Sequence, residues 1–135
     1  MRHRLSLVAL LATLPLAARA ADAQPRWKPI GKTNVGNPVE IDTRVKREQG
    51  IVKTFIRTRF VPPKKTARGN ITTAKTEVWI DCAKHMVAMP VNTYYLDEAK
   101  NSIYQTNRVG IPGYAPAMGG SGTELAVQYV CEKKK

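Results

Sequence analysis

The stretch Lys75–Cys82 (KTEVWIDC) decides how the rest of this chain is interpreted. Its polar and apolar residues alternate, which is typical of a β-strand with one buried face. Val78, Ile80 and Cys82 fall on that face, so the cysteine is expected to point inward. The second cysteine, Cys131, ends a segment with helical signals at residues 121–131. A disulfide between Cys82 and Cys131 would fasten this last helix to the middle of a sheet.

The first residues have the pattern of a secretory leader. A basic start precedes the apolar run at residues 5–17, and a membrane-spanning helix would need about 20 apolar residues. Small-x-small motifs then end at Ala20 and Ala23, so we predict a signal peptide over residues 1–23 with cleavage after one of these alanines. Residues 24–135 are expected to form one exported domain without a transmembrane segment. Two cysteines in a small exported domain are expected to pair, which predicts the Cys82–Cys131 disulfide.

Alternating residues predict strands through most of the exported domain. Short strands are expected at residues 27–31 and 39–42. The longest strand is expected at residues 51–61, with Val52, Thr54, Ile56, Thr58 and Phe60 facing the core. Further strands are expected at residues 71–82, 83–96 and 102–106. Three segments are expected to lie outside the strands: a charged turn at 46–50, a break at Pro62-Pro63 and a basic loop at 64–69.

A glycine- and proline-rich connection at residues 110–120 leads into the final helix. Ser121 and Glu124 match a capping box, in which each residue satisfies a backbone N–H group at the start of a helix. Strands followed by one helix indicate an α+β fold. We therefore predict an antiparallel sheet of about five to six strands with one C-terminal helix packed on a face, tied by the disulfide.

No pattern in the exported domain predicts catalysis, a metal site or a cofactor. His85 lies near Cys82, but zinc needs three or four ligands, and an oxidised cysteine is no nucleophile. Glu77 and Asp81 share a strand face, but four residues along a strand span roughly 13 Å, which is too far for the carboxylate pair of a glycosidase. We expect no catalytic residue, and we expect that the protein is not an enzyme.

Positive charge is the strongest chemical feature, with a formal net charge of +12. A basic stripe is predicted along the longest strand and the loop after it, and it would attract polyanions. The alternative is that these cations only keep an exposed sheet from aggregating. Nucleic acid is not expected as the biological target of an exported protein. The predicted stripe consists of Lys53, Arg57, Arg59, Lys64, Lys65 and Arg68.

Several spaced residues resemble the surface-adhesin protein E-like domain family of Gram-negative bacteria. The resemblance covers residues 27–131 and rests on Trp27, the segment 39–42, the long strand after Gly50, the run from Glu77 to Cys82 and the final segment that ends at Cys131. It implies an antiparallel sheet with a disulfide-tied C-terminal helix and the capacity to form homodimers. The family's namesake is an adhesin that binds host extracellular-matrix and serum proteins. The resemblance implies no catalytic residues.

Two functions follow from these features. The first is an exported, non-enzymatic, adhesin-like binding protein that engages host proteins or polyanions through a basic face. The alternative is a soluble periplasmic accessory or inhibitor-type protein that binds an envelope component or an enzyme. The namesake is anchored by a lipid, whereas the leader predicted here has no cysteine to carry one. A periplasmic or secreted location is therefore expected, and display on the cell surface is left open.

Overall fold

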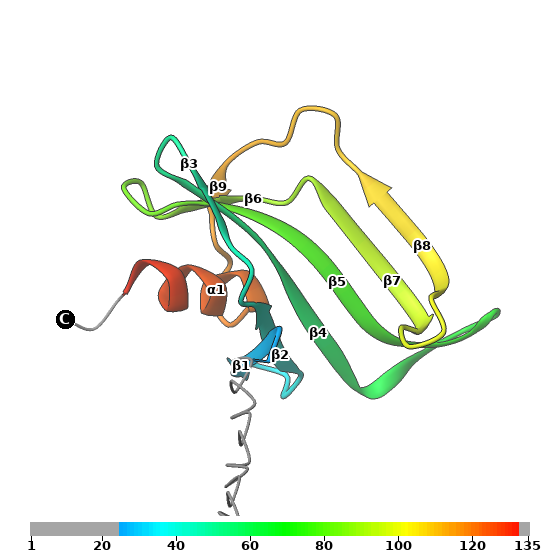
Figure 1. Cartoon of the computed structure of the whole chain (residues 1–135). Coiled ribbons are helices and arrows are strands. Elements are labelled where there is room, and N and C mark those ends of the chain that lie inside the picture. Colours follow the sequence, from blue (N-terminus) through cyan, green and yellow to red (C-terminus); the bar gives the residue numbers. More distant parts are fainter. Residues whose placement is uncertain (1–24, 133–135) are drawn as a thin grey trace, which may run out of the picture.

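The fold is an antiparallel sheet with one helix against it. The computed structural model describes residues 25–132, so the predicted signal peptide and both of its cleavage sites lie outside the described residues. Within residues 25–132, nine strands form the sheet and one helix covers part of one face (Figure 1). The predicted fold class is confirmed, although the sheet has nine strands where about five to six were expected.

Two long strands form the spine of the sheet. β4 and β5 pair with each other, and each has two shorter partners on its other side: β2 and β3 on β4, and β6 and β7 on β5. β1, β8 and β9 extend the sheet from β2, β7 and β6. The elements are β1 (Trp27–Lys32), β2 (Pro38–Asp42), β3 (Lys46–Glu48), β4 (Ile51–Thr66), β5 (Gly69–Asp81), β6 (Met86–Ala88), β7 (Val91–Asp97), β8 (Ser102–Arg108), β9 (Ala115–Pro116) and α1 (Gly122–Cys131).

The alternation of β4 and β5 separates a buried face from an outer face. Val52, Ile56, Val78 and Ile80 are buried, as predicted, on the face that α1 covers. Val52 lies opposite Ile80 across the two strands, so the side chains of both strands enter the same core. We call the opposite side of the sheet, which carries the odd-numbered residues from Ile51 to Arg59, the outer face.

α1 packs closely on this core because its contact residues are small. Ala126, Val127 and Val130 are buried against the sheet. A Cβ atom added at Gly122 would lie 3.3 Å from Ile56 Cδ1, so the glycine permits the first turn to approach the sheet.

The predicted capping box forms at the start of α1, except that Glu124 bonds the amide of Gly120, one residue before the N-cap Ser121. Ser121 Oγ accepts from the Glu124 amide at 3.2 Å, and Glu124 Oε2 accepts from the Gly120 amide at 2.6 Å.

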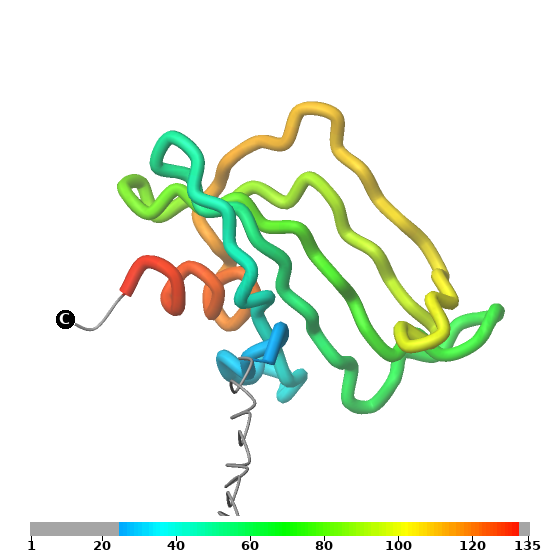
Figure 2. The backbone as a smooth tube through the Cα atoms, viewed as in Figure 1, coloured from blue at the N-terminus to red at the C-terminus, as the bar shows by residue number. Residues whose placement is uncertain are grey.

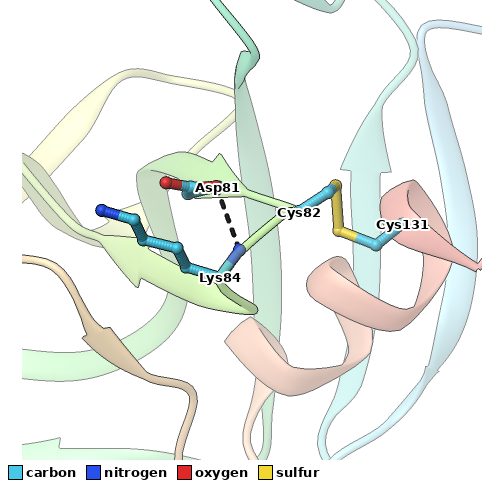
Figure 3. Close-up of a disulfide and its surroundings, with 4 residues drawn as sticks. All are labelled: Asp81, Cys82, Lys84 and Cys131. Carbon is cyan, nitrogen blue, oxygen red and sulfur yellow. Dashed lines mark hydrogen bonds between the residues drawn. A yellow bond between two sulfur atoms is a disulfide. The ribbon is translucent and has the colours of Figure 1, made fainter.

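The predicted disulfide is present and joins the helix to the sheet. Cys82 directly follows β5, Cys131 is the last residue of α1, and their Cα atoms are 5.3 Å apart (Figure 3). In the turn after β5, the Lys84 amide donates to Asp81 Oδ1 at 3.2 Å. The two ends of the bond are therefore held by a strand end and a helix end.

Four local expectations were wrong. The connection expected at residues 110–120 contains the two-residue strand β9, which pairs with β6. Pro62 and Pro63 do not end β4, which continues to Thr66. The strand register shifts between Arg59 and Lys64, so both prolines lie in an irregular segment where no ladder N–H is required. The segment expected as a basic loop is therefore the end of a hairpin, in which Thr66 pairs with Gly69. The charged turn at residues 46–50 likewise contains strand β3.

Candidate binding surface

The structure divides the six cations of the predicted stripe into two groups. Lys53, Arg57 and Arg59 alternate along β4 on the outer face. The other three cations occupy the end of the β4–β5 hairpin, beyond the proline irregularity. Because the register shifts between Arg59 and Lys64, the two groups do not continue one line along the strand. The function predicted for the six residues stays a prediction, and the structure shows what each of them contacts.

Arg57 is held inside a network of carboxylates and aromatic rings. Its Nη2 lies 2.6 Å and its Nε 2.7 Å from Glu40 Oε2, and its Nη1 lies 3.5 Å from Glu98 Oε1. The guanidinium also lies 4.4 Å from the centroid of the Trp27 ring. Only 22% of the Arg57 side chain is exposed. Arg57 is thus neutralised within the protein, and we assign it a structural role.

Lys53 is neutralised in the same manner. Its Nζ bonds Glu48 Oε2 at 2.9 Å and lies 4.5 Å from the centroid of the Trp79 ring. This hydrogen bond, together with the charge of the ammonium group, lowers the pKa of the Glu48 carboxyl below its ordinary value. Lys53 and Arg57 therefore contribute little free positive charge to the outer face.

The end of the hairpin keeps its charge. We use "basic hairpin" for residues 59–70, which add Arg59, the last residue before the register shift, to the three cations at the hairpin end. All four cations, Arg59, Lys64, Lys65 and Arg68, are exposed. Among the residues that the structure describes, no carboxylate lies within ion-pair distance of any of these four. The hairpin projects past the turn between β7 and β8 (Figures 1 and 2). Its charges therefore face solvent on a protruding element.

Aromatic rings position two of these cations. Lys64 Nζ lies 4.3 Å from the centroid of Phe60. The Arg68 guanidinium lies 4.2 Å from the centroid of Tyr104, and its Nη2 donates to the Tyr104 carbonyl at 2.9 Å. A ring attracts a cation through its quadrupole but carries no net charge. Lys64 and Arg68 are thus oriented without being neutralised. Lys53 and Arg57 also lie on aromatic rings, but each has a carboxylate partner as well.

The sequence did not predict a hollow on the outer face. We call it the outer hollow; it has a volume of about 280 Å³ and lies where β6 and β7 follow each other along β5. Its walls combine aromatic residues, cations and one carboxylate, contributed by Phe55, Tyr95, Arg26, Lys75, Arg108 and Glu77. These residues come from five segments, so no local spacing in the sequence indicates them.

The side chains considered for catalysis or metal binding are oxidised, exposed in a turn, or hydrogen-bonded within the protein. Cys82 is oxidised, and His85 is an exposed turn residue with a φ of 52°. Glu77 Oε1 accepts from the Trp79 indole N–H at 2.9 Å. Within residues 25–132, no three or more histidine, cysteine, aspartate or glutamate side chains gather as metal ligands. No helix in the same range has the length and apolar character needed to cross a membrane.

Comparisons with known proteins support the fold. No family model and no curated protein matches this chain. Among solved structures, the chain is similar to Haemophilus influenzae protein E in its crystal form II, with a TM-score of 0.56 and 10% sequence identity. The match covers 82% of this chain and 91% of that chain. A likeness at this identity shows the fold alone, and this fold is the one implied by the resemblance to protein E-like domains.

Proposed function

We propose that this protein is an exported, non-enzymatic binding protein of the adhesin type, and that the basic hairpin is its contact surface. One observation carries the proposal: four exposed cations lie on a projecting hairpin without a carboxylate partner in the described part of the chain. The other two cations of the predicted stripe, Lys53 and Arg57, are already paired. The resemblance to protein E-like domains supports a binding role of this kind.

The proposed partner is a polyanion or an acidic surface on a host extracellular-matrix or serum protein. Such a partner replaces the counterions around the hairpin, so binding should weaken as salt rises. Contact by Lys64 and Arg68 requires little ordering of their side chains, because Phe60 and Tyr104 already position the two cations. The proposal includes no catalytic step and no cofactor.

The test is salt-dependent retention on immobilised heparin. A hairpin variant carries Lys64→Gln, Lys65→Gln and Arg68→Gln. A control variant carries Arg44→Gln, Arg47→Gln and Lys84→Gln, which removes the same charge from exposed positions elsewhere. The wild type and the control variant should elute at similar salt concentrations, and the hairpin variant much earlier. Equal losses of retention in the two variants would mean that only net charge matters, and would refute the role of the hairpin.

Location decides between the adhesin role and the alternative periplasmic role. An adhesin must be reached by added protease on intact cells, or be recovered from the medium. We expect digestion on intact cells, with a periplasmic marker protein left intact as the control. Full protection followed by release on osmotic shock would instead favour the accessory or inhibitor-type protein, which binds a partner inside the envelope.

A further inference from the structure

The outer hollow arises from an interruption in pairing beside β5. β6 pairs with β5 from Trp79 onward and β7 pairs with it up to Thr76, so neither strand pairs with Glu77 or Val78. The chain between the two strands passes through Pro90, which has no N–H group to offer a ladder. The sheet is therefore open over Glu77 and the residue opposite it on β4, Phe55. Side chains around the opening form the hollow of about 280 Å³.

Tyr95 lines this hollow and carries a hydroxyl group that no other described group uses. Only 7% of the residue is exposed, and it lines the hollow from β7. Among the described residues, no side chain or backbone group forms a hydrogen bond with the Tyr95 hydroxyl. In the same part of the chain, no fully buried side-chain oxygen lacks a partner, so this hydroxyl is open to solvent. A buried ring with a free hydroxyl group at a hollow provides a fixed hydrogen-bond donor for a ligand.

A cation that is unpaired among the described residues, Arg108, lines the hollow together with this donor. Arg108 has no carboxylate within ion-pair distance in the described part of the chain, and the nearest carboxylate to Lys75 Nζ is Glu98 at 3.8 Å. Arg26 also lines the hollow, with its guanidinium bonded to Asp42 at 2.9 Å. Among the described residues of this wall, Arg108 is therefore the unpaired cation, and Lys75, whose contact with Glu98 is longer than a hydrogen bond, keeps donors that a ligand can use. A carboxylate on a ligand would receive charge-assisted hydrogen bonds from this arrangement.

The other walls define the rest of the ligand. Phe55 supplies an aromatic surface suited to the C–H face of a ring. Glu77 accepts one hydrogen bond, from Trp79, and its remaining lone pairs can accept from ligand hydroxyl groups. A purely aromatic acid would leave those lone pairs facing an apolar group, which is unfavourable. The volume of about 280 Å³ is near the lower end of the range of about 300–1,000 Å³ typical of ligand sites, which suits a small ligand of one ring.

We propose that the outer hollow is a binding site for a hydroxylated organic carboxylate of single-ring size, the class to which sugar acids belong. Tyr95, Arg108 and Lys75 bind the carboxylate, Glu77 accepts hydrogen bonds from ring hydroxyl groups, and Phe55 packs against the ring. This inference goes beyond the proposed function and does not rest on it, because the basic hairpin contributes none of these residues.

The test is an NMR titration of backbone amides with D-glucuronate, followed over β5, β7 and β8. D-Glucose serves as the neutral ring and inorganic phosphate as the anion without a ring. Wild-type protein should bind D-glucuronate at least about tenfold more tightly than either probe, because only D-glucuronate engages both the cations and Glu77. Equal responses to D-glucuronate and phosphate, or no response to D-glucuronate, would overturn the proposal.

Variants connect the response to individual groups. Tyr95→Phe removes only the hydroxyl group, and it should weaken D-glucuronate binding by about tenfold. Arg108→Gln, at an exposed residue where folding is not at risk, should have an effect of similar size. The hairpin variant Lys64→Gln, Lys65→Gln, Arg68→Gln should bind D-glucuronate like the wild type. Wild-type affinity in both Tyr95→Phe and Arg108→Gln would refute the site, and a loss in the hairpin variant would show that the response only follows net charge.

Discussion

The two ends of the β4–β5 hairpin are built differently. At the end near α1, the sheet buries a cluster that includes Val39, Ile41, Val78 and Ile80, each fully buried, beneath the helix and the disulfide. At the hairpin end, a second cluster of Phe60, Ile71 and Ala74 is covered only by partly buried neighbours such as Tyr94 and Leu96. We call these the covered half and the open half.

The difference places most of the stabilising burial in one half and the proposed contact surface in the other. Fully buried aliphatic side chains give the covered half most of the apolar burial that stabilises a small domain. The open half buries less, and it presents cations and aromatic rings to solvent. We therefore expect that its surface can be changed with a smaller loss of folding free energy than the covered half would suffer, and in the proposed function it holds the basic hairpin in place. The following substitutions test this division.

Removal of the disulfide should have the largest effect. The bond joins residues 49 positions apart, and the chain-entropy model gives roughly 4 kcal/mol for a loop of that length. Cys82→Ala and Cys131→Ala should each lower the melting temperature by about 15 °C or more. Thermal unfolding followed by circular dichroism, with and without reductant, measures this. A wild type that melts at the same temperature in both conditions would contradict the prediction.

Matched isoleucine truncations should differ between the halves. Ile80 is fully buried in the covered half, and Ile80→Ala should reduce the free energy of unfolding by about 4 kcal/mol, because the helix and the sheet cannot close the cavity. Ile71 lies in the open half, where neighbouring rings can move into the space, so Ile71→Ala should cost about 2 kcal/mol. Urea unfolding measures both values. Equal losses would mean that the two halves are equally packed.

Paired and unpaired arginines on one strand provide a finer comparison. Arg57→Gln leaves Glu40 and Glu98 partly buried without their main partner and removes the cation from the Trp27 ring. We expect a loss of about 1–2 kcal/mol of unfolding free energy. Arg59→Gln, two residues along the same face, should change it by less than about 0.5 kcal/mol. Urea unfolding of both variants measures this, and equal effects would show that the network contributes nothing specific.

Features determined by local sequence were predicted correctly. The alternation in β4 and β5 identified the buried face, and Ser121 with Glu124 identified the start of α1. The cysteine count and the expected export identified the disulfide. The first two features depend on residues close together in the sequence. The disulfide could be predicted because two cysteines allow only one pairing within the chain.

Features that depend on a distant partner strand were missed. The partners of Arg57 lie 17 and 41 residues away, so the spacing of the basic residues did not reveal that this cation is neutralised. Pro62 and Pro63 normally end a strand, but a register shift against β5 accommodates both. The outer hollow depends on where β6 stops and β7 starts beside β5, which only the pairing determines.

The smallest effect concerns the ion pair at the edge of the covered half. The hydrogen bond from Lys53 and its charge lower the pKa of Glu48, so the folded state binds a proton less readily than the unfolded chain. The stabilisation is therefore present above the unfolded pKa of Glu48 and is lost as the pH falls through the lowered folded value.

Lys53→Met should raise the pKa of Glu48 toward its ordinary value, as measured by NMR titration of the carboxyl carbon. The exposed Lys84→Met is the control and should leave it unchanged. The same pKa in wild type and Lys53→Met would show that the pair does not persist in solution. Lys53 would then be a free cation on the outer face, separated from the basic hairpin by the paired Arg57.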